Sequence, residues 1–443
     1  MELLVLGVFV AELIVMVALG LPVWAPLAVG LAIFWGYGLA RGHSPAALER
    51  MTASGVKTAA GVLEAFVLIG ILTALWRASG TISQIVVMTS SLVGPTTIPV
   101  ASFLLCALVS YLIGSSFATA ATMGVVCGTM TAAMDANLVL AGGAILSGCY
   151  FGDRCSPVSS SALLVRTVTD TRLQDNLRAM MATAAVPLVV SVVAYAALGS
   201  LLPASGAAAS GLADTLRAAY GYHLVALLPA VAILVMPLAG MGMKRSMAIS
   251  SVVAALVCLF VQHLSPRDLL VWCVAGYTCP HEAVAGLMSG GGLASMVSVS
   301  AVVCLSSSYA GIFDETGLLG GVRGHVDAIA RRYGPFSAVL AVGIPASMIA
   351  CNQTLAIMLT QQLCEGVETD ARSLAIDLEN GPVVISPLIP WSIAGTTILG
   401  LAQAPTAGIL TAIYLWLIPI WHLFCKSLKF FEKQACKPAE ASV

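Results

Sequence analysis

The chain has 443 residues, of which 59% are hydrophobic and only 9% are charged. A soluble domain carries about 25% charged residues, so the composition excludes a soluble protein and indicates an integral membrane protein with many spans. The formal net charge of −1 argues against a nucleic-acid-binding surface. The 12 cysteines include no C-x-x-C pair, which argues against a disulfide framework or a metal site.

The first predicted elements are two apolar helices within residues 1–40, where Glu2 and Glu12 are the only charged residues. Gly20 and Pro22 interrupt this stretch, and each part is close to the roughly 20 residues that one membrane span needs. The N-terminus has no basic segment, so we expect a retained first helix and not a cleaved signal peptide.

Three basic residues mark a loop at 41–57, and a third span is predicted at 62–76. The positive-inside rule places this loop in the cytoplasm, together with the basic C-terminal tail at 426–443. Because two spans precede the loop, we expect the N-terminus to be cytoplasmic as well. The predicted location is the inner (plasma) membrane.

Residues 78–134 carry no formal charge, but Ser, Gly and Thr interrupt the apolar sequence. The elements predicted up to the middle of the chain are a re-entrant or broken helix at 78–95, spans at 99–113, 138–151 and 182–201, and a polar break at 114–123. In the second half of the chain, the predicted spans are 223–240, 246–262, 293–311, 336–350 and 405–424, and an acidic loop is predicted at 365–379. The fold class is therefore all-α, a polytopic membrane protein with about 10–12 transmembrane helices.

The most unusual segment is Gly152–Ser161, which places two charges, a proline and four serines directly after an apolar run. A polar, helix-breaking segment in a membrane persists only where protein or a water-filled cavity surrounds its backbone. A shorter counterpart, Ser386-Pro387, occurs late in the chain. Both are preceded by a polar break, at Ser115-Ser116 and at Asn352-Gln353, by 41 and 34 residues respectively.

The recurring order predicts two repeats, which we expect to be inverted, with broken helices that meet near the membrane midplane. The predicted boundaries are 1–202 for the first repeat, 203–221 for a linker and 222–425 for the second repeat, followed by the tail. The alternative is that a large membrane protein scatters such breaks without any duplication.

Asp153 is the main candidate for chemistry. A carboxylate near the membrane midplane costs roughly 2.5–3.5 kcal/mol, so it usually has a function or a partner. Desolvation favours its protonated form and a bound cation favours its ionised form, so such a group can exchange a proton for Na+. The alternative is a structural pair with Arg154 or Arg166 at the edge of a loop.

Hydroxyl and amide groups near the four breaks supply the oxygen ligands that Na+ prefers. The predicted ion- or substrate-binding residues are Asp153, Ser115, Ser116, Thr119, Ser156, Ser160, Asn352, Gln353, Ser386 and Thr396, with Na+ held by Asp153 and Ser156. For any single hydroxyl the alternative is ordinary helix packing or hydrogen bonding within its own helix.

Other ionisable residues are weaker candidates. Glu64 and Glu12 lie in apolar runs, and either could be a proton site or a structural partner for Arg77. Asp314 and Glu315 lie beside a Gly-containing break. A further residue, His281, is more typical of a satisfied helix-end histidine than of a ligand.

Four motifs occur in order over roughly residues 60–400: Leu68-Ile69-Gly70 with Trp76 and Ser79-Gly80-Thr81, the run Gly114–Thr122, the run Ser147–Pro157, and the run Ser386–Trp391. They resemble the corresponding segments of the NhaC-type sodium/proton antiporter family of the ion-transporter superfamily. The family usually continues Ser-Pro-Leu-Ser-Asp-Thr after the third motif, whereas Ser160 stands here where that Asp would be.

The resemblance implies a secondary transporter that exchanges Na+ for H+ by alternating access, and not an enzyme. Because Ser160 removes one anionic ligand, a Na+- or H+-coupled carrier of a small organic acid or amino acid is the alternative, and a passive channel is a further one. A membrane enzyme has no support from C-x-x-C, H-E-x-x-H or G-x-S-x-G motifs. We expect no cofactor beyond transported Na+ and H+, no nucleic-acid partner, and contacts with the lipid bilayer and a small ion or organic solute; a homodimer stays open.

Overall fold

The computed structural model consists of helices in the part of the chain that it describes, residues 2–19, 21–89, 93–202, 209–221, 223–316, 323–368 and 370–435. The helices before the linker are α1 (Glu2–Ala18), α2 (Trp24–Ala40), α3 (Pro45–Thr58), α4 (Ala60–Ala78), α5 (Thr81–Thr89), α6 (Ile98–Ile113), α7 (Ser116–Thr119), the π-helix η1 (Ala120–Gly124), α8 (Val125–Ala133), α9 (Leu138–Cys155), α10 (Ser160–Thr169) and α11 (Leu173–Leu201).

The later helices begin with α12 (Ala209–Tyr220), the 3₁₀ helix η2 (Leu224–Leu227), α13 (Leu228–Leu238), α14 (Met243–Phe260), α15 (Pro266–Ala275), α16 (Glu282–Met288) and α17 (Gly292–Thr316). They continue with α18 (Arg323–Tyr333), α19 (Pro335–Ala350), α20 (Gln353–Leu363), α21 (Ala371–Asn380), α22 (Pro382–Ile385), η4 (Ser386–Leu388), α23 (Ile393–Leu401), η5 (Thr406–Thr411) and α24 (Ile413–Ala435). The predicted all-α class is confirmed.

Five helices of the described chain are long and apolar enough to cross a membrane, and two bent helix pairs raise the number to seven. The bent pairs are Asp214–Tyr220 with Leu224–Pro237, at 96°, and Ala371–Leu388 with Ile393–Leu401, at 56°. Five shorter apolar helices have 10–17 residues. If these also cross, the total is ten, or twelve with the bent pairs, which is the predicted range.

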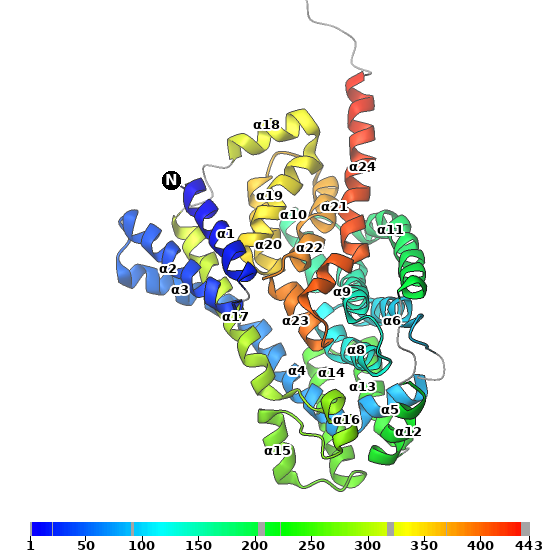
Figure 1. Ribbon diagram of the computed structural model, residues 1–443. Coiled ribbons are helices and arrows are strands. Elements are labelled where there is room, and N and C mark those ends of the chain that lie inside the picture. The colour runs from blue at the N-terminus through cyan, green and yellow to red at the C-terminus, as the bar shows by residue number, and fades with distance from the viewer. Residues whose placement is uncertain are drawn as a thin grey trace, which may run out of the picture.

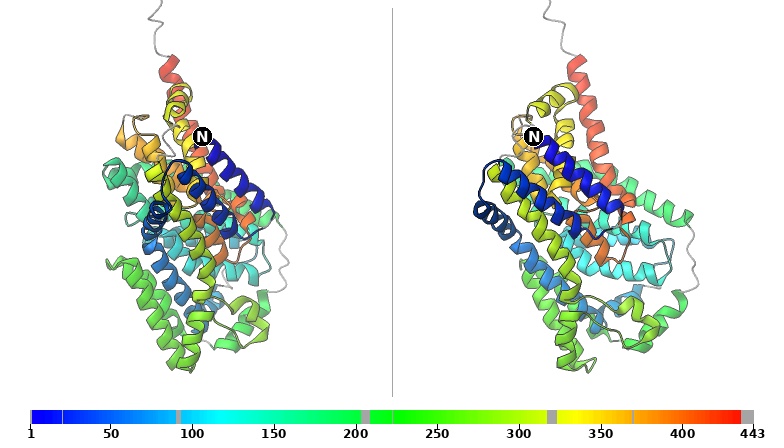
Figure 2. Two further views of the ribbon diagram at one scale, coloured as in Figure 1. Left: turned by 90° about the vertical axis from the view of Figure 1, so that its left-hand side faces the viewer. Right: turned by 60° about the vertical axis from the view of Figure 1, so that its left-hand side comes forward.

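Figure 1 shows the arrangement of the helices, and two apolar cores hold them together. One core combines buried residues of α1–α5 with residues of α13–α17, and the other combines buried residues of α6 and α9–α11 with residues of α19–α24. Each core therefore combines helices from both halves of the sequence, and the proposed repeat boundaries stay a prediction. The start of α1 and the end of α24 lie at the same end of the molecule in all views (Figure 2).

Glycines allow two helix pairs to approach closely. A Cβ atom on Gly311 of α17 would lie 2.0 Å from the carbonyl oxygen of Met51 in α3. A Cβ atom on Gly152 of α9 would lie 2.0 Å from the backbone carbon of Ser110 in α6. Small residues at such crossings let membrane helices associate through dispersion contacts between their backbones. The second contact positions the end of α9, which carries Asp153.

The two predicted polar breaks have the same backbone geometry. Helix α6 ends at Gly114 and helix α19 ends at Cys351, both in the left-handed conformation with φ of 71° and 55°. The next residues, Ser115 and Asn352, are extended and cap the following helix with their side chains. A reversal of this kind needs one residue at positive φ, which glycine adopts without strain. The shared geometry supports an internal duplication of these segments.

Three segments differ from the prediction. The expected loop at 41–57 contains helix α3, because Pro45 starts the helix after the Ser44 cap and the helix packs on α17. The acidic loop predicted at 365–379 contains helix α21, whose carboxylates are buried. In the predicted linker, residues 203–208 lie outside the described residues and 209–220 form α12. Charge made the first two segments look like loops, and a Gly/Ala/Ser-rich composition did so for the third, but packing against neighbouring helices overrides these signals.

Candidate functional site

A cavity of about 590 Å³ lies beside the break between α6 and α7 and the break between α19 and α20. We call it the Asp153 cavity. Six of the ten predicted site residues line it: Asp153, Ser115, Ser116, Ser160, Asn352 and Gln353. They come from α7, α9, α10 and α20 or from the residues that cap these helices, so both breaks and the Gly152–Ser161 segment meet at one place.

Asp153 lies in the last turn of α9 and is only 3% exposed. Its Oδ2 atom accepts hydrogen bonds from Gln353 Nε2 at 3.2 Å and from Ser161 Oγ at 3.3 Å. The backbone N–H of Ser116 is a further donor to the carboxylate. Its own backbone carbonyl accepts from Ser159 and from Ser161, the latter at 2.7 Å. These bonds fix the orientation of the carboxylate at the edge of the cavity.

Three helices begin around this carboxylate. Ser116, Ser160 and Gln353 are the first residues of α7, α10 and α20, and each helix has a polar N-cap. A helix N-terminus presents unpaired N–H groups and a positive end of the helix dipole, both of which stabilise a negative charge. Asp153 is therefore buried in a setting that can hold the ionised carboxylate without a cationic side chain.

Arg154 does not pair with Asp153. It is fully buried and donates to Met180 O at 3.1 Å, to Thr183 Oγ1 at 2.8 Å and to Asn380 Oδ1. The sequence interpretation in which Asp153 forms a structural pair with Arg154 is thus wrong.

Glu379, in helix α21, interacts electrostatically with both Arg154 and Asp153. It is 0% exposed, and neither of its carboxylate oxygens has a hydrogen-bond partner. Membrane carboxylates without hydrogen bonds are costly and usually functional. Asp153, Arg154 and Glu379 therefore form one buried ionisable cluster, which we call the Asp153–Glu379 cluster. The sequence pattern did not indicate Glu379, because this residue lies in the segment predicted as an acidic loop.

Four predicted residues do not line the Asp153 cavity. Ser156 is buried at the end of α9, and Thr119 Oγ1 donates to the backbone carbonyl of Ser115 at 2.9 Å. Ser386 Oγ bonds within its own helical turn and to Ser347 Oγ at 3.2 Å. Thr396 lines a different cavity and donates to Ser392 O at 2.9 Å. The hydroxyl groups of Thr119, Ser386 and Thr396 each donate a hydrogen bond to a backbone carbonyl four residues earlier in the chain.

The other carboxylates lie elsewhere. Glu64 pairs with Lys244, with 2.6 Å between Oε2 and Nζ, and both are largely exposed. The carboxylate oxygens of Glu12 in α1 are buried without a hydrogen-bond partner. The side chains of Asp314 and Glu315 lie outside the described residues. Among the described residues no three His, Cys, Asp or Glu side chains group in a way that could hold a metal ion.

A second cavity of about 200 Å³ lies further along the same helices. We call it the Arg77 cavity. Helix α4 lines the Asp153 cavity with Phe66 and Ile69 and the second cavity with Thr73 and Arg77. The helix from α7 to α8, α17 and α23 also contribute residues to both cavities.

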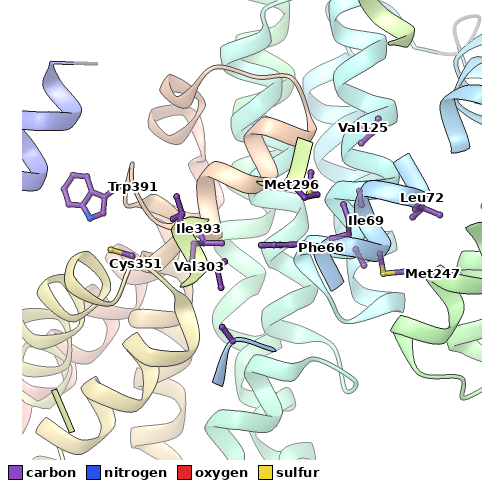
Figure 3. Close-up of a cluster of buried hydrophobic side chains, with 14 of the residues drawn as sticks. Phe66, Ile69, Leu72, Val125, Met247, Met296, Val303, Cys351, Trp391 and Ile393 are labelled. Atoms are coloured by element: carbon purple, nitrogen blue, oxygen red, sulfur yellow. The ribbon is translucent and has the colours of Figure 1, made fainter. Parts of the chain in front are cut away.

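Apolar side chains separate the two cavities. Phe66, Ile69 and Val303 line the Asp153 cavity, and Val125 and Met296 line the Arg77 cavity. Figure 3 shows all five in one buried cluster between the helices, which we call the septum. The septum therefore contains lining residues of both cavities.

The site described above lies largely in the part of the chain that matches a known protein family. A family model described as the Na+/H+ antiporter family matches residues 148–424. The chain belongs to this family. The matched region begins in the middle of α9 and includes Asp153, the α19–α20 break and Glu379.

Individual relatives of this antiporter extend over more of the chain. The "Malate-2H(+)/Na(+)-lactate antiporter" of Bacillus subtilis is 24% identical over 432 residues, which cover 94% of this chain and 92% of the relative. The "Na(+)/H(+) antiporter NhaC" of the same organism is 26% identical over 365 residues, covering 79% of each chain. The "Arginine/ornithine antiporter ArcD" of Halobacterium salinarum is 27% identical over 413 residues, covering 89% of this chain and 84% of the relative.

Proposed function

We propose that this antiporter-family protein exchanges Na+ for H+ across the plasma membrane by alternating access, with Asp153 as the residue that binds either ion. The observation that carries the proposal is a buried carboxylate without a cationic partner at the wall of a large cavity, where two broken helices meet. Broken helices near the midplane are the usual place for coupling ions in such transporters. The family match and the NhaC relatives support the same exchange.

The Asp153–Glu379 cluster explains how one site can serve both ions. With both carboxyl groups ionised, the two negative charges and Arg154 leave a net charge of −1. An uncompensated charge is unfavourable in a low-dielectric interior, so the cluster favours uptake of one cation. A proton on the carboxylate or a Na+ beside it restores neutrality, and the two exclude each other. One Na+ then exchanges for one H+ at this cluster.

The ligands for Na+ would be oxygen atoms around the Asp153 carboxylate. The side chains of Ser116 and Ser160 line the cavity beside it, and so do Ile113 and Gly114 at the end of α6. The last carbonyl groups of a helix have no intrahelical partner and can coordinate a cation. Asp153 would supply the charge, and these neutral oxygens would replace part of the hydration shell of Na+.

The direction of access follows from charge. Helix α3 carries Arg50 and Lys57 and directly precedes α4, so the positive-inside rule assigns the start of α4 to the cytoplasm. Residues from the first half of α4 line the Asp153 cavity, and residues from the second half line the Arg77 cavity. The Asp153 cavity would then be the cytoplasmic one, and the septum would open and close during transport. The termini would be cytoplasmic.

The test is proton movement in proteoliposomes. An inward Na+ gradient should drive protons outward in the wild type, reported by a trapped pH-sensitive dye. Asp153→Asn should lose this exchange, while Asp170→Asn, a matched change at an exposed loop carboxylate, should keep it. If Na+ moves no protons in the wild type, or if Asp153→Asn couples normally, the proposal is wrong.

A further inference from the structure

The Arg77 cavity has a composition that Na+/H+ exchange does not require. Among the described residues that line it, Arg77 is the one charged side chain. The other lining residues are apolar, or carry hydroxyl, amide or glycine backbone groups: Thr73, Val125, Gly290, Gly291, Ser295, Met296, Val299, Thr396, Thr397, Gly400, Leu401 and Gln403. A cavity whose only charge is positive repels Na+ and attracts an anion.

The guanidinium group of Arg77 is buried but only partly satisfied. Arg77 is 3% exposed, and its Nη1 donates to Leu287 O at 2.7 Å. Its Nε is buried and has no hydrogen-bond partner. Guanidinium has five N–H donors, so further acceptors can bind to it. The titratable group that interacts with it electrostatically is the phenol of Tyr220, which carries no charge at neutral pH.

A buried arginine in a membrane protein normally pairs with an acidic side chain or with backbone carbonyls, and a carbonyl carries no counter-charge. The counter-charge here is absent from the residues that line the cavity. Arg154 Nε also lacks a hydrogen-bond partner, but Glu379 interacts with Arg154 and four acceptors receive its other N–H groups. Arg77 therefore stands out among the buried arginines as one whose protein surroundings leave its charge uncompensated.

Other groups at the cavity also suit an anion. Helix α17 begins at Gly292, directly after the lining residues Gly290 and Gly291, so its positive N-terminal end is at the cavity. The Oγ1 atom of Thr397 is buried without a partner and lines the same cavity. A hydroxyl group can donate to a carboxylate oxygen.

The glycine segment is shaped by close packing. Gly291 has φ of 77°, and a Cβ atom there would lie 2.5 Å from the backbone nitrogen of Ala74 in α4. Glycine therefore lets the segment before α17 approach the part of α4 that carries Arg77.

We propose that the Arg77 cavity binds a small organic carboxylate, held by the Arg77 guanidinium and the Thr397 hydroxyl group. A carboxylate matches the planar donor pair of arginine and forms two parallel hydrogen bonds with it. Since one water occupies about 30 Å³ in the liquid, the cavity of about 200 Å³ accommodates on the order of six water-sized groups, which is about the size of lactate, and succinate is slightly larger. Apolar neighbours such as Met296 and Val299 suit the carbon chain of such an anion.

Binding is measured by equilibrium dialysis of the purified full-length protein with radiolabelled L-lactate and, separately, succinate. At least one of the two should bind to the wild type. Arg77→Gln should weaken binding by about tenfold or more, as expected for a lost hydrogen bond to a charged group. Arg166→Gln, the same change at an exposed arginine, should leave binding unchanged.

A second variant keeps the test valid if Arg77→Gln does not fold, which size-exclusion chromatography would reveal. Thr397→Val preserves shape and should weaken carboxylate binding by roughly two- to tenfold. Asp153→Asn should bind the carboxylate normally, which separates this site from the proposed exchange site. The proposal is overturned if neither carboxylate binds at millimolar concentration, if a folded Arg77→Gln or Thr397→Val binds like the wild type, or if chloride competes as well as the unlabelled carboxylate.

Discussion

The two cavities differ in charge although the same helices line them. The Asp153 cavity has the buried Asp153 carboxylate at its wall, and its other charged lining residue, Lys244, is exposed and paired with Glu64; the Arg77 cavity has a buried guanidinium as its charged group. The difference arises where the helices end. At the Asp153 cavity two breaks and the Gly152–Ser161 segment bring three helix starts to one carboxylate, whereas at the Arg77 cavity one helix start and an arginine meet.

This comparison shows that the local arrangement of helix ends, and not the apolar helix faces, decides which ion a cavity suits. A carboxylate within reach of carbonyl and hydroxyl oxygens suits a cation, and a guanidinium with a helix N-terminus suits an anion. The septum keeps the two environments apart. Three substitutions test whether charge and separation have these roles.

The largest effect in this set is expected for Glu379→Gln. Removing this charge leaves Asp153 as the one carboxylate of the cluster, so the summed charge of Asp153 and Arg154 is zero with Asp153 ionised, and the cluster has little need of Na+.

 Na+ affinity should therefore fall by about 10- to 100-fold, and the variant should also be less stable because Arg154 loses the carboxylate that interacts with it. Isotopic ²²Na+ binding and thermal unfolding measure the two effects. Glu49→Gln, at an exposed carboxylate of α3, should change neither, and normal Na+ affinity in folded Glu379→Gln would exclude Glu379 from the site.

The septum is tested by Phe66→Ala. Truncating this buried ring opens space between the two cavities, and Phe→Ala substitutions in a core typically cost 3–5 kcal/mol of stability. We expect a Na+ leak that no longer depends on proton counterflow, measured as ²²Na+ efflux from proteoliposomes at equal pH on both sides. Phe260→Ala removes a ring that is 73% exposed and should cause no leak. Tight coupling in Phe66→Ala would show that the septum is not the barrier.

The smallest effect is expected for Ser160→Asp, which restores the carboxylate found in the resembling family motif. The added charge lies at the wall of the Asp153 cavity and should raise Na+ affinity severalfold at alkaline pH, since two carboxylates bind a cation more strongly than one. Ser160→Asn is the uncharged control. Equal Na+ affinity in Ser160→Asp, Ser160→Asn and the wild type would mean that position 160 does not contact the ion.

Much of the fold could be predicted because uninterrupted apolar runs and Gly, Pro and Ser breaks are local signals. The breaks at Ser115-Ser116 and Asn352-Gln353 both appear as helix breaks with a polar cap, and they line one cavity together with Asp153. The sequence also identified six residues that line one cavity.

The remaining features depend on packing that a hydropathy pattern does not record. Glu379 lies in a segment whose charges predicted a loop, but helix α21 buries it beside Arg154, 225 positions away in the chain. The Arg77 cavity requires Gly290 and Gly291 to approach α4, a contact between distant segments. Thr119 and Ser386 were selected for their hydroxyl groups, which instead bond to nearby backbone carbonyls.

The most direct test of the central claim is the affinity for Na+ measured as a function of pH. If one proton and one Na+ compete for the Asp153–Glu379 cluster, protonation at low pH removes the negative charge that Na+ needs. The dissociation constant for Na+ should then rise as the pH falls, approaching about tenfold per pH unit, and this dependence should disappear in Asp153→Asn. A dissociation constant that stays the same across the pH range in the wild type would contradict the account.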